Sequence, residues 1–545
     1  MKLLLLLSLL PLLSFSYNPY TDYFFCRYFQ EEKPTVAERY CLSALNRSPS
    51  LTLFVDTIRL ELLLRKKEKA LKLAQKLKSS YPKNYESYLT LHSVYSLMGQ
   101  KDKALSALEE GYRELPNSKE IILFLADEYL KREENTKAKA VVENLAKESP
   151  DNPLPYYMLA RIYLSEGNRE LAIEYLEKSL QIKKTFEAGF ITLGSIYEEK
   201  GEYTNAEQLY MSILKESPDN RAALERLGYL YVMTNRLEEA KDIYKKLSQL
   251  YPEGNYAYQY ALILMRSSQY DEAREILHEL YLENPDHIDV AYTYALVLEL
   301  TKETDKARGI YERLYEKDPT NTKVIERLAG IYMDRGDYQK AEGLLRKGLS
   351  TSPNSYELNL LMGNLMSEEG KPQEALTHVD KAISINPKDY RGYFIKALIH
   401  DKAGHIVNAE ENLRRAIELN PEDPDLLNHL GYSLLLWYGS ARVDEAEKLI
   451  FAALSKDKEN PAYIDSYAWV LYHRGRYEEA YKLLKKAYSK EQKDPVINEH
   501  IGDVLLKLGQ EREAIGYYKR AMELLKAGKR GEPGQEERLK EKLKE

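Results

Sequence analysis

The chain has 545 residues, of which 30% are charged, and its 79 Lys and Arg stand against 86 Asp and Glu for a formal net charge of −7. The two signs are interspersed and no strongly basic patch is visible, which argues against a nucleic-acid partner. A chain of this length would ordinarily hold several globular domains, but its internal repeat predicts one continuous array instead.

The first sixteen residues have the composition of a cleavable export signal. A positive Lys2 precedes the apolar run 3–13, and small serines follow at positions 14 and 16. The alternative is a membrane anchor, but eleven apolar residues fall short of the roughly 20 needed to cross about 30 Å of hydrocarbon. No later stretch is long and apolar enough to span a bilayer, so we expect no integral membrane segment after cleavage.

Only two cysteines occur, Cys26 and Cys41, and both fall near the expected new N-terminus. The repeat frame places them on the two helices of one hairpin, fifteen residues apart, where a disulfide is geometrically conceivable. Such a bond would persist in an oxidising compartment. The alternative is a pair of small buried thiols that pack as hydrophobic residues.

One pattern of residue types returns about every 34 residues, and residues 187–218 show it most clearly. Apolar and small residues recur three, four and seven apart in two successive stretches, which predicts two amphipathic helices. The first set is Phe190, Leu193, Gly194 and Tyr197, and the second is Ala206, Tyr210 and Ile213. Gly201 suits the turn between them because it tolerates positive φ, and Pro218 ends the unit because it cannot continue a helix.

Prolines close most units at steps of 33 or 34 residues. One unit has Lys184 at the closing position in place of a proline. The closing prolines are Pro49, Pro82, Pro116, Pro150, Pro218, Pro252, Pro285, Pro319, Pro353, Pro387 and Pro421. An alanine stands twelve residues before each: Ala37, Ala70, Ala104, Ala138, Ala206, Ala240, Ala273, Ala307, Ala341, Ala375 and Ala409. A small residue at this place predicts the closest approach of two helices, where a larger side chain would hold the axes apart.

A helical unit with a Leu-Gly pair, a tyrosine, a small alanine and a closing proline resembles the tetratricopeptide repeat. The pairs that carry the resemblance are Leu193-Gly194, Leu227-Gly228, Met362-Gly363, Leu430-Gly431 and Ile501-Gly502. The resemblance implies an all-α fold, a right-handed α-solenoid of about fifteen stacked hairpins over residues 18–526.

The quality of the repeat suggests boundaries along the chain. Residues 17–82 keep the alanine but lose the Leu-Gly pair, and residues 83–423 form the regular array. The block 424–526 resembles part of bacterial tetratricopeptide proteins, many of them exported, and its step from Leu434 to Ala446 carries three extra residues, which predicts a longer turn. Residues 527–545 are charged and could be a capping helix or a frayed end.

No motif of catalysis, cofactor binding or metal binding stands out. The nine histidines are scattered singly, and no HExxH, phosphate-binding loop, GxGxxG or GxSxG occurs. We therefore expect a protein that is not an enzyme and needs no cofactor or metal.

In tetratricopeptide arrays the concave face is lined mainly by the first helix of each hairpin. By register, the resemblance places these candidates there: Tyr157, Arg161, Tyr229, Tyr258, Tyr292, Asn364, Phe394, Tyr432 and Trp469, with Asp127, Glu225, Arg391, Asn428 and Asp465 among them. Such a groove suits an extended peptide or a partner helix. The alternative is simple packing, because a chain with 46 tyrosines places some on any face.

These observations lead to an expectation about function. We expect a non-enzymatic scaffold of the bacterial cell envelope, exported to the periplasm, that binds a protein or peptide in its concave groove and associates with an envelope complex, with or without peripheral contact to a membrane. The alternatives are an accessory subunit of an envelope enzyme complex, such as one for surface polysaccharide assembly, and a cytoplasmic adaptor.

Overall fold

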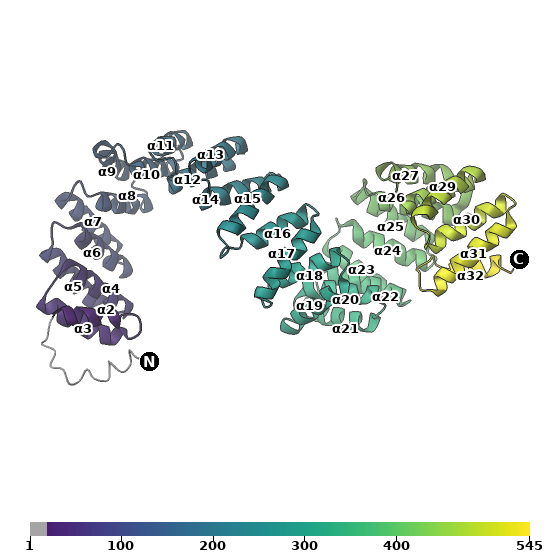
Figure 1. Cartoon of the computed structure of the whole chain (residues 1–545), viewed down its shortest axis with the longest axis horizontal. Helices are drawn as coiled ribbons and strands as arrows, with labels where there is room; N and C mark the ends of the chain where they lie inside the picture. Colours follow the sequence, from purple (N-terminus) through teal and green to yellow (C-terminus); the bar gives the residue numbers. More distant parts are fainter. Residues whose placement is uncertain (1–18, 545) are drawn as a thin grey trace. The chain divides into compact units, whose positions relative to one another are not determined.

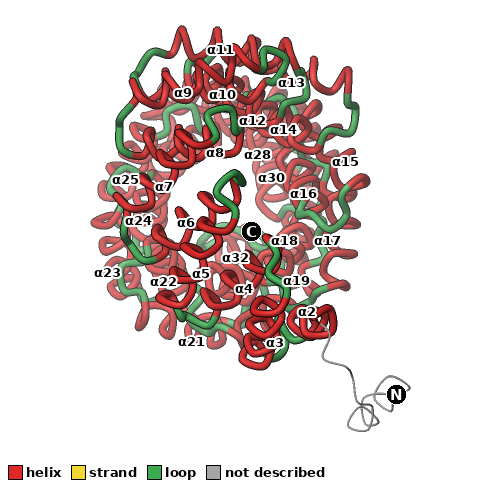
Figure 2. Tube along the Cα trace, turned by 90° about the vertical axis from the view of Figure 1, so that its left-hand side faces the viewer, coloured by secondary structure: helices red, strands yellow, loops and turns green. Residues whose placement is uncertain are grey.

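The computed structural model describes residues 19–544, and every regular element in that range is a helix (Figure 2). The expected export signal at residues 1–16 lies outside the described part of the chain. The chain divides into two compact units, one ending at Ser268 and one beginning at Gln269 (Figure 1). This division reflects packing, whereas the boundaries expected from the sequence reflect the quality of the repeat motif.

The N-terminal unit contains α2 (Pro19–Tyr28), α3 (Pro34–Arg47), α4 (Leu51–Leu63), α5 (Lys67–Ser80), α6 (Tyr85–Leu97), α7 (Lys101–Glu114), α8 (Lys119–Lys131), α9 (Asn135–Glu148), α10 (Pro153–Ser165), α11 (Arg169–Ile182), α12 (Glu187–Glu199), α13 (Tyr203–Glu216), α14 (Arg221–Met233), α15 (Leu237–Leu250) and α16 (Tyr256–Arg266).

The C-terminal unit contains α17 (Tyr270–Glu283), α18 (Ile288–Leu300), α19 (Thr304–Lys317), α20 (Thr322–Asp334), α21 (Tyr338–Thr351), α22 (Tyr356–Glu368), α23 (Pro372–Ile385), α24 (Tyr390–Lys402), α25 (Ile406–Leu419), α26 (Pro424–Tyr438), the 3-10 helix η2 (Gly439–Arg442), α27 (Val443–Lys456), α28 (Pro461–His473), α29 (Tyr477–Lys490), α30 (Pro495–Lys507), α31 (Glu511–Lys526) and α32 (Gln535–Lys542).

In chain order, α2 to α15 of the N-terminal unit form seven helix-turn-helix pairs, and α18 to α31 of the C-terminal unit form seven more. Within each unit a helix packs on the next one, as α12 packs on α13 and α13 on α14. The predicted all-α solenoid of stacked hairpins is confirmed. No helix in the described range combines the length and the apolar character that crossing a bilayer requires.

Helix ends follow from local backbone chemistry. Gly201 takes φ +74° in the turn between α12 and α13, a left-handed conformation that costs glycine little. Asn220 then caps α14, because its side-chain oxygen accepts a hydrogen bond from the backbone nitrogen of Ala223 at 2.9 Å. These two devices fix where one helix stops and the next begins.

The glycine of the Leu-Gly pair allows the two helices of a hairpin to approach closely. A Cβ atom at Gly194 would lie 1.9 Å from the hydroxyl of Tyr210, which is fully buried on α13. At the other end of the chain, a Cβ atom at Gly502 would lie 2.4 Å from the ring of Tyr518. The small residue therefore makes room for a buried tyrosine of the second helix.

The alanines that precede the closing prolines are all buried, none of them more than 1% exposed. Their predicted place at helix crossings is confirmed. First helices of neighbouring hairpins also contact each other, as α6 contacts α8, α12 contacts α14, and α26 contacts α28. In the N-terminal unit, α9, α11 and α13 lie outside α8, α10 and α12 (Figure 1). The first helices thus line the inner side of this unit.

Both ends of the array carry special features. In the first hairpin, Cys26 on α2 and Cys41 on α3 are joined at an S–S distance of 2.07 Å. In the C-terminal unit, η2 occupies the longer turn between α26 and α27. The charged tail contains the helix α32, whose Leu539 is fully buried.

Candidate functional site

Six of the fourteen candidate residues occupy one recurring place in the hairpin, directly after the small residue that packs on the second helix. We call this place the inner position. Its members named here are Asp127, Arg161, Tyr229, Asn364, Tyr432, Trp469 and Asp503, which follow Ala126, Ala160, Gly228, Gly363, Gly431, Ala468 and Gly502. Because the small residue faces the second helix, the next side chain points toward neighbouring first helices or solvent.

In the N-terminal unit the inner position is open. Tyr229 on α14 is 48% exposed, and the guanidinium of Arg226 lies 5.9 Å from its ring centre. Tyr258 on α16 is half-buried. Tyr157 on α10 is also half-buried, and its ring meets that of Phe186 edge-on at 5.6 Å. Part of each predicted aromatic therefore contributes to packing, and Tyr229 presents the largest free surface of the three.

A polar pair connects two first helices in the same unit. Arg161 on α10 donates to Asp127 on α8 at 3.1 Å, and Lys131 lies 2.9 Å from the same carboxylate. Burial opposes ionisation of this carboxyl, but hydrogen bonds from Lys131 and Arg161 outweigh it and lower the pKa of Asp127. The sequence placed both residues on one face, and the structure brings them together.

Glu225 on α14 is held by neighbours on the same face. It accepts from Arg221 at 3.0 Å and from the hydroxyl of Tyr256 on α16. Arg221 also donates to that hydroxyl at 2.7 Å. The carboxylate is thus already paired within the unit, which leaves the aromatic rings as the more available surface.

In the C-terminal unit several candidates are half-buried in contacts of their own. Tyr292 on α18 meets the ring of Tyr311 at 5.7 Å, and Phe394 on α24 meets His429 edge-on at 5.3 Å. Asn364 on α22 is also half-buried. Arg391 is bound to the N-cap Asp389, with its Nη2 at 2.6 Å, so it stabilises the start of α24.

Tyr432 and Trp469 differ from the prediction of an open groove, because other parts of the chain cover them. Trp469 is only 9% exposed and its ring stacks between those of Tyr472, at 4.4 Å, and His500, at 4.0 Å. The hydroxyl of Tyr432 donates to Glu532, which lies in the tail beyond the last repeat. The segment that covers Tyr432 was invisible to a register argument, because the tail lies outside the repeat, whereas Trp469 is covered by side chains of α28 and α30.

A chain of four polar groups, Asp465, His500, Tyr432 and Glu532, runs through this region. Asp465 on α28 binds Nδ1 of His500 at 3.0 Å, and Nε2 of His500 lies 3.1 Å from the hydroxyl of Tyr432. Burial alone would lower the pKa of His500, but the charge of Asp465 and its hydrogen bond raise it to about 9. Burial and then the charge of Glu532 raise the pKa of Tyr432 well above its ordinary value. A charged imidazolium therefore lies between two carboxylates, with a neutral phenol as the bridge to Glu532.

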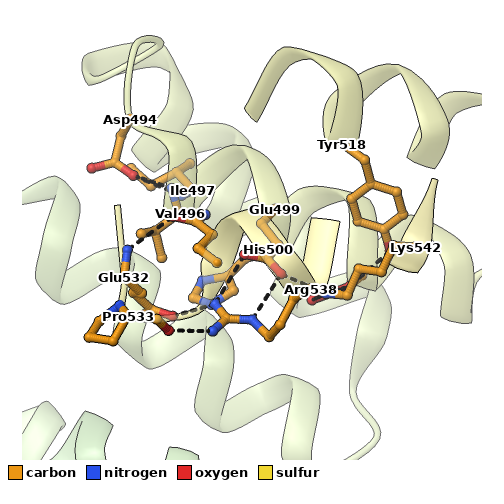
Figure 3. A network of polar contacts seen from close by, with 12 residues as sticks. Asp494, Val496, Ile497, Glu499, His500, Tyr518, Glu532, Pro533, Arg538 and Lys542 are labelled. Atoms are coloured by element: carbon orange, nitrogen blue, oxygen red, sulfur yellow. Dashed lines mark hydrogen bonds and ion pairs between the residues drawn. The ribbon is translucent and has the colours of Figure 1, made fainter. Parts of the chain in front are cut away.

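A second set of ion pairs joins α30 to α32 (Figure 3). Arg538 contacts the carboxylate of Glu499 at 3.2 Å and that of Glu532 at 2.8 Å. Lys542 contacts Glu499 at 2.9 Å and Asp503 at 2.6 Å. The Glu499 side chain is 3% exposed, and although burial opposes its ionisation, Lys542 and Arg538 hold its pKa below the ordinary value. These contacts fasten the tail to the last repeat.

Sequence reasoning did not select the residues of this network apart from Tyr432 and Asp465. The missed residues are Glu499, His500, Asp503, Glu532, Arg538 and Lys542. Glu499 and His500 stand on the apolar-patterned first helix of the last repeat, where charged residues are unusual. Arg538 and Lys542 lie four apart on one face of the tail helix, so the available signal was a basic face opposite an acidic one.

The described residues contain no cluster of three or more His, Cys, Asp or Glu side chains suited to holding a metal ion. The polar groups brought together at the C-terminal end pair with one another as ions and hydrogen-bond partners.

Three known families match segments of the helical array. Residues 68–256 match the family described as the tetratricopeptide repeat protein 21 C-terminal ARM domain, and residues 264–330 and 311–527 match two tetratricopeptide repeat families. No curated protein matches the chain.

Two solved structures illustrate the similarity. The crystal structure of the APC/C hetero-tetramer Cut9-Hcn1 is 17% identical, with a TM-score of 0.44 over 90% of this chain and 96% of that chain. The structure of Naa15/Naa10 bound to HypK-THB is 18% identical, with a TM-score of 0.30 over 95% of this chain and 85% of that chain.

Stacked hairpins with buried alanines and a first-helix inner surface define a helical-repeat protein. The family matches make the assignment more specific, since they run from residue 68 to residue 527 with one short gap, at residues 257–263. The chain contains tetratricopeptide repeats, which the family models place at residues 264–330 and 311–527.

Proposed function

We propose that this protein is a non-enzymatic scaffold that binds an extended segment or a helix of another protein on the inner side of its first helices. The observation that carries this proposal is the open aromatic surface of the N-terminal unit, where Tyr229 is 48% exposed beside Arg226. Exposed aromatic rings beside a guanidinium are typical of residues that dominate protein interfaces. Because the helices are stacked before a partner arrives, little ordering is required on binding.

The direct test compares two exposed tyrosines on opposite sides of the same unit. Tyr229→Ala removes a ring from first helix α14, and Tyr203→Ala removes a ring that is 39% exposed at the start of second helix α13. Partners are first captured from host extracts with the unmodified chain and identified, and binding is then titrated with each variant. We expect Tyr229→Ala to weaken binding roughly tenfold and Tyr203→Ala to leave it unchanged.

Circular dichroism of both variants serves as the control for folding. Equal binding by the unmodified chain and Tyr229→Ala, with helix content retained, would contradict the assignment of this surface. Equal weakening by both tyrosine variants would contradict it as well, because the inner side would then have no special role.

We further propose that the scaffold is exported and acts in the bacterial cell envelope, in association with an envelope complex. The apolar run at residues 3–13 supports export. The bond between Cys26 and Cys41 fits an oxidising compartment, where disulfides persist. N-terminal sequencing of the protein from its host tests this point, since export predicts a chain that begins at Tyr17 and a cytoplasmic protein keeps Met1.

A further inference from the structure

The tail of the chain covers inner positions that the N-terminal unit leaves open. Tyr432, Trp469 and Asp503 hold the inner position on α26, α28 and α30, as Tyr229 does on α14. Glu532 accepts from Tyr432, and Lys542 reaches Asp503 at 2.6 Å. The segment 529–542 therefore lies where the proposed function would place a partner.

The tail carries charges that match the surface beneath it. Its acidic residue, Glu532, meets the Tyr432 hydroxyl, behind which lies the charged ring of His500. Its basic residues, Arg538 and Lys542, meet the acidic side of α30 (Figure 3). Among the charged side chains of the segment that meet this surface, the order is thus one acidic residue followed by two basic residues on one turn-and-helix element.

The attachment of the tail is local, and a glycine with positive φ stands at each end of its loop. Gly528 takes φ +82° after α31, and Gly534 takes φ +71° before α32. Leu539 is the fully buried apolar anchor. The contact of Arg530 with Glu368 at 3.1 Å uses a side chain that is 87% exposed, so it adds little to the attachment.

The tail is also an incomplete occupant of this surface. Nε1 of Trp469 is buried without a hydrogen-bond partner among the described residues. Nε2 of Gln535, in the tail itself, is also buried without a hydrogen-bond partner in the described range. An unsatisfied buried donor weakens a contact, so a segment that offers an acceptor to Trp469 would fit this surface better than the tail does.

We propose that the inner surface of α26, α28 and α30 is a binding site for a partner segment with an acidic residue followed, after a turn, by a short helix that presents two basic residues to α30. Residues 529–542 occupy this site as an internal ligand until such a segment displaces them. The inference rests on the proposed function, because it assigns a partner class to the same inner surface at the other end of the array.

The tether explains why displacement requires a strong partner. A short flexible linker holds an internal ligand at an effective concentration on the order of millimolar. The apparent affinity for a competing segment is reduced by the fraction of molecules whose site is free. Loosening the tail from its own site must therefore increase the affinity for an added segment.

The probe is a labelled synthetic peptide of residues 528–544, titrated into the full-length protein. The released variant carries three substitutions in the tail alone: Glu532→Gln, Arg538→Ala and Leu539→Ala. We expect the peptide to bind this variant at least tenfold more tightly than it binds the unmodified chain. Adding Tyr432→Phe to the released variant should weaken peptide binding, whereas adding Tyr229→Phe in the N-terminal unit should leave it unchanged.

A second variant, Glu532→Gln alone, keeps Leu539 and the ion pairs of Arg538 and Lys542 with α30, and so guards against fraying of the last repeat. It should show a smaller gain in peptide affinity. Equal peptide affinity of the unmodified chain and both variants overturns the proposal. Absence of binding to the released variant, with its helix content retained, overturns it too. Because the probe is a synthetic peptide and not the captured partner, this failure would leave the Tyr229 test of the scaffold function unaffected.

Discussion

The two ends of the array are closed by different chemistry. At the N-terminal end, a covalent bond joins Cys26 on α2 to Cys41 on α3, and both residues are fully buried. At the C-terminal end, Arg538 and Lys542 of the tail bind acidic residues of α30. A terminal hairpin lacks a neighbour on one side, so each end needs a substitute for the missing repeat.

The difference has a consequence for binding. A bond within one hairpin uses no inner surface, and the inner position of the N-terminal unit stays open at Tyr229. Closing by a folded-back tail covers inner positions at Tyr432 and Asp503. The stability of the C-terminal end, which is closed by ion pairs, should therefore depend on salt and pH. The stability of the N-terminal end, which is closed by a disulfide, should depend on reductant.

The largest effect is expected from removing the cations of the tail. Arg538→Ala with Lys542→Ala leaves the buried Glu499 carboxylate without its partners, and breaking a buried ion pair costs up to about 3–5 kcal/mol. The loss of stability cannot exceed the free energy with which the tail docks, because Glu499 is exposed to water and no longer buried once the tail has undocked. Hydrogen exchange of α30 to α32 should accelerate accordingly.

The matched control is Arg161→Ala, which deletes a cation of a pair whose side chains are 38% and 33% exposed. We expect a loss of about 0.2–1 kcal/mol there, seen as a small change in exchange of α8 and α10. Equal acceleration at both sites would show that the tail contacts are ordinary surface pairs.

The next effect concerns the covalent end. Cys26→Ser with Cys41→Ser opens a link across 15 residues of sequence, and a loop of this size corresponds to about 3 kcal/mol in the chain-entropy account. Exchange in α2 and α3 should accelerate, as should exchange of the unmodified chain in a thiol reductant. Exchange in α30 to α32 should stay the same, and a parallel change there would disprove independent closure of the ends.

A smaller, pH-dependent effect is expected at His500. Burial alone would lower the pKa of this histidine, but the charge and hydrogen bond of Asp465 raise it to about 9. A raised pKa means that the folded state binds the proton more tightly, so this stabilisation is complete below the ordinary value near 6.5 and is lost as pH rises through about 9. Asp465, Glu532 and Asp503 are the charged groups that favour the proton.

The measurement uses the fluorescence of Trp469, which stacks on His500, in a Trp437→Phe background that leaves one tryptophan. The signal should change between pH 7 and 10 in the His500 protein. In His500→Gln the change should be absent, because glutamine does not titrate. A transition that persists in the glutamine variant would assign it to another group.

The repeat pattern was enough to predict most of the fold. The spacing of alanines and prolines, with the Leu-Gly pair, encodes helix crossings directly, as the burial of Ala206 and the close approach of Gly194 to Tyr210 show. Register also brought Arg161 and Asp127 to one face, where the structure pairs them. Each of these correct predictions depends on contacts within one repeat or between neighbouring repeats, and the period of the sequence predicts such contacts.

The covered site escaped prediction because it depends on contacts outside the repeat. Glu532 is separated by 100 residues from Tyr432, and no period connects them. The pairing of Cys26 with Cys41 remained open for a related reason, since spacing alone permits either a bond or two packed thiols. Where the tail or a terminal hairpin replaces a neighbour, register no longer says which side chains meet.

The smallest effect contrasts two buried glutamates at opposite ends. Glu61 on α4 is fully buried, and neither carboxylate oxygen has a hydrogen-bond partner among the described residues. Burial, and then the charge of Glu38, raise the pKa of Glu61. For an acid this means that the folded state holds the proton more tightly, so stability falls as pH rises above the ordinary value near 4.3. Glu499 is nearly as buried but paired, and its pKa is lowered.

Substitution by glutamine should therefore have opposite signs at the two glutamates. Glu61→Gln removes a buried charge at neutral pH and should stabilise α4 and its neighbours by about 1 kcal/mol, with the gain vanishing near pH 4. Glu499→Gln deprives Arg538 and Lys542 of their partner and should destabilise α30 to α32. Local hydrogen exchange at pH 7 measures both. Destabilisation by Glu61→Gln would contradict this prediction, because it would mean that groups other than its neighbours in this structure stabilise the Glu61 carboxylate. The two ends would then differ only in being closed by a disulfide and by ion pairs.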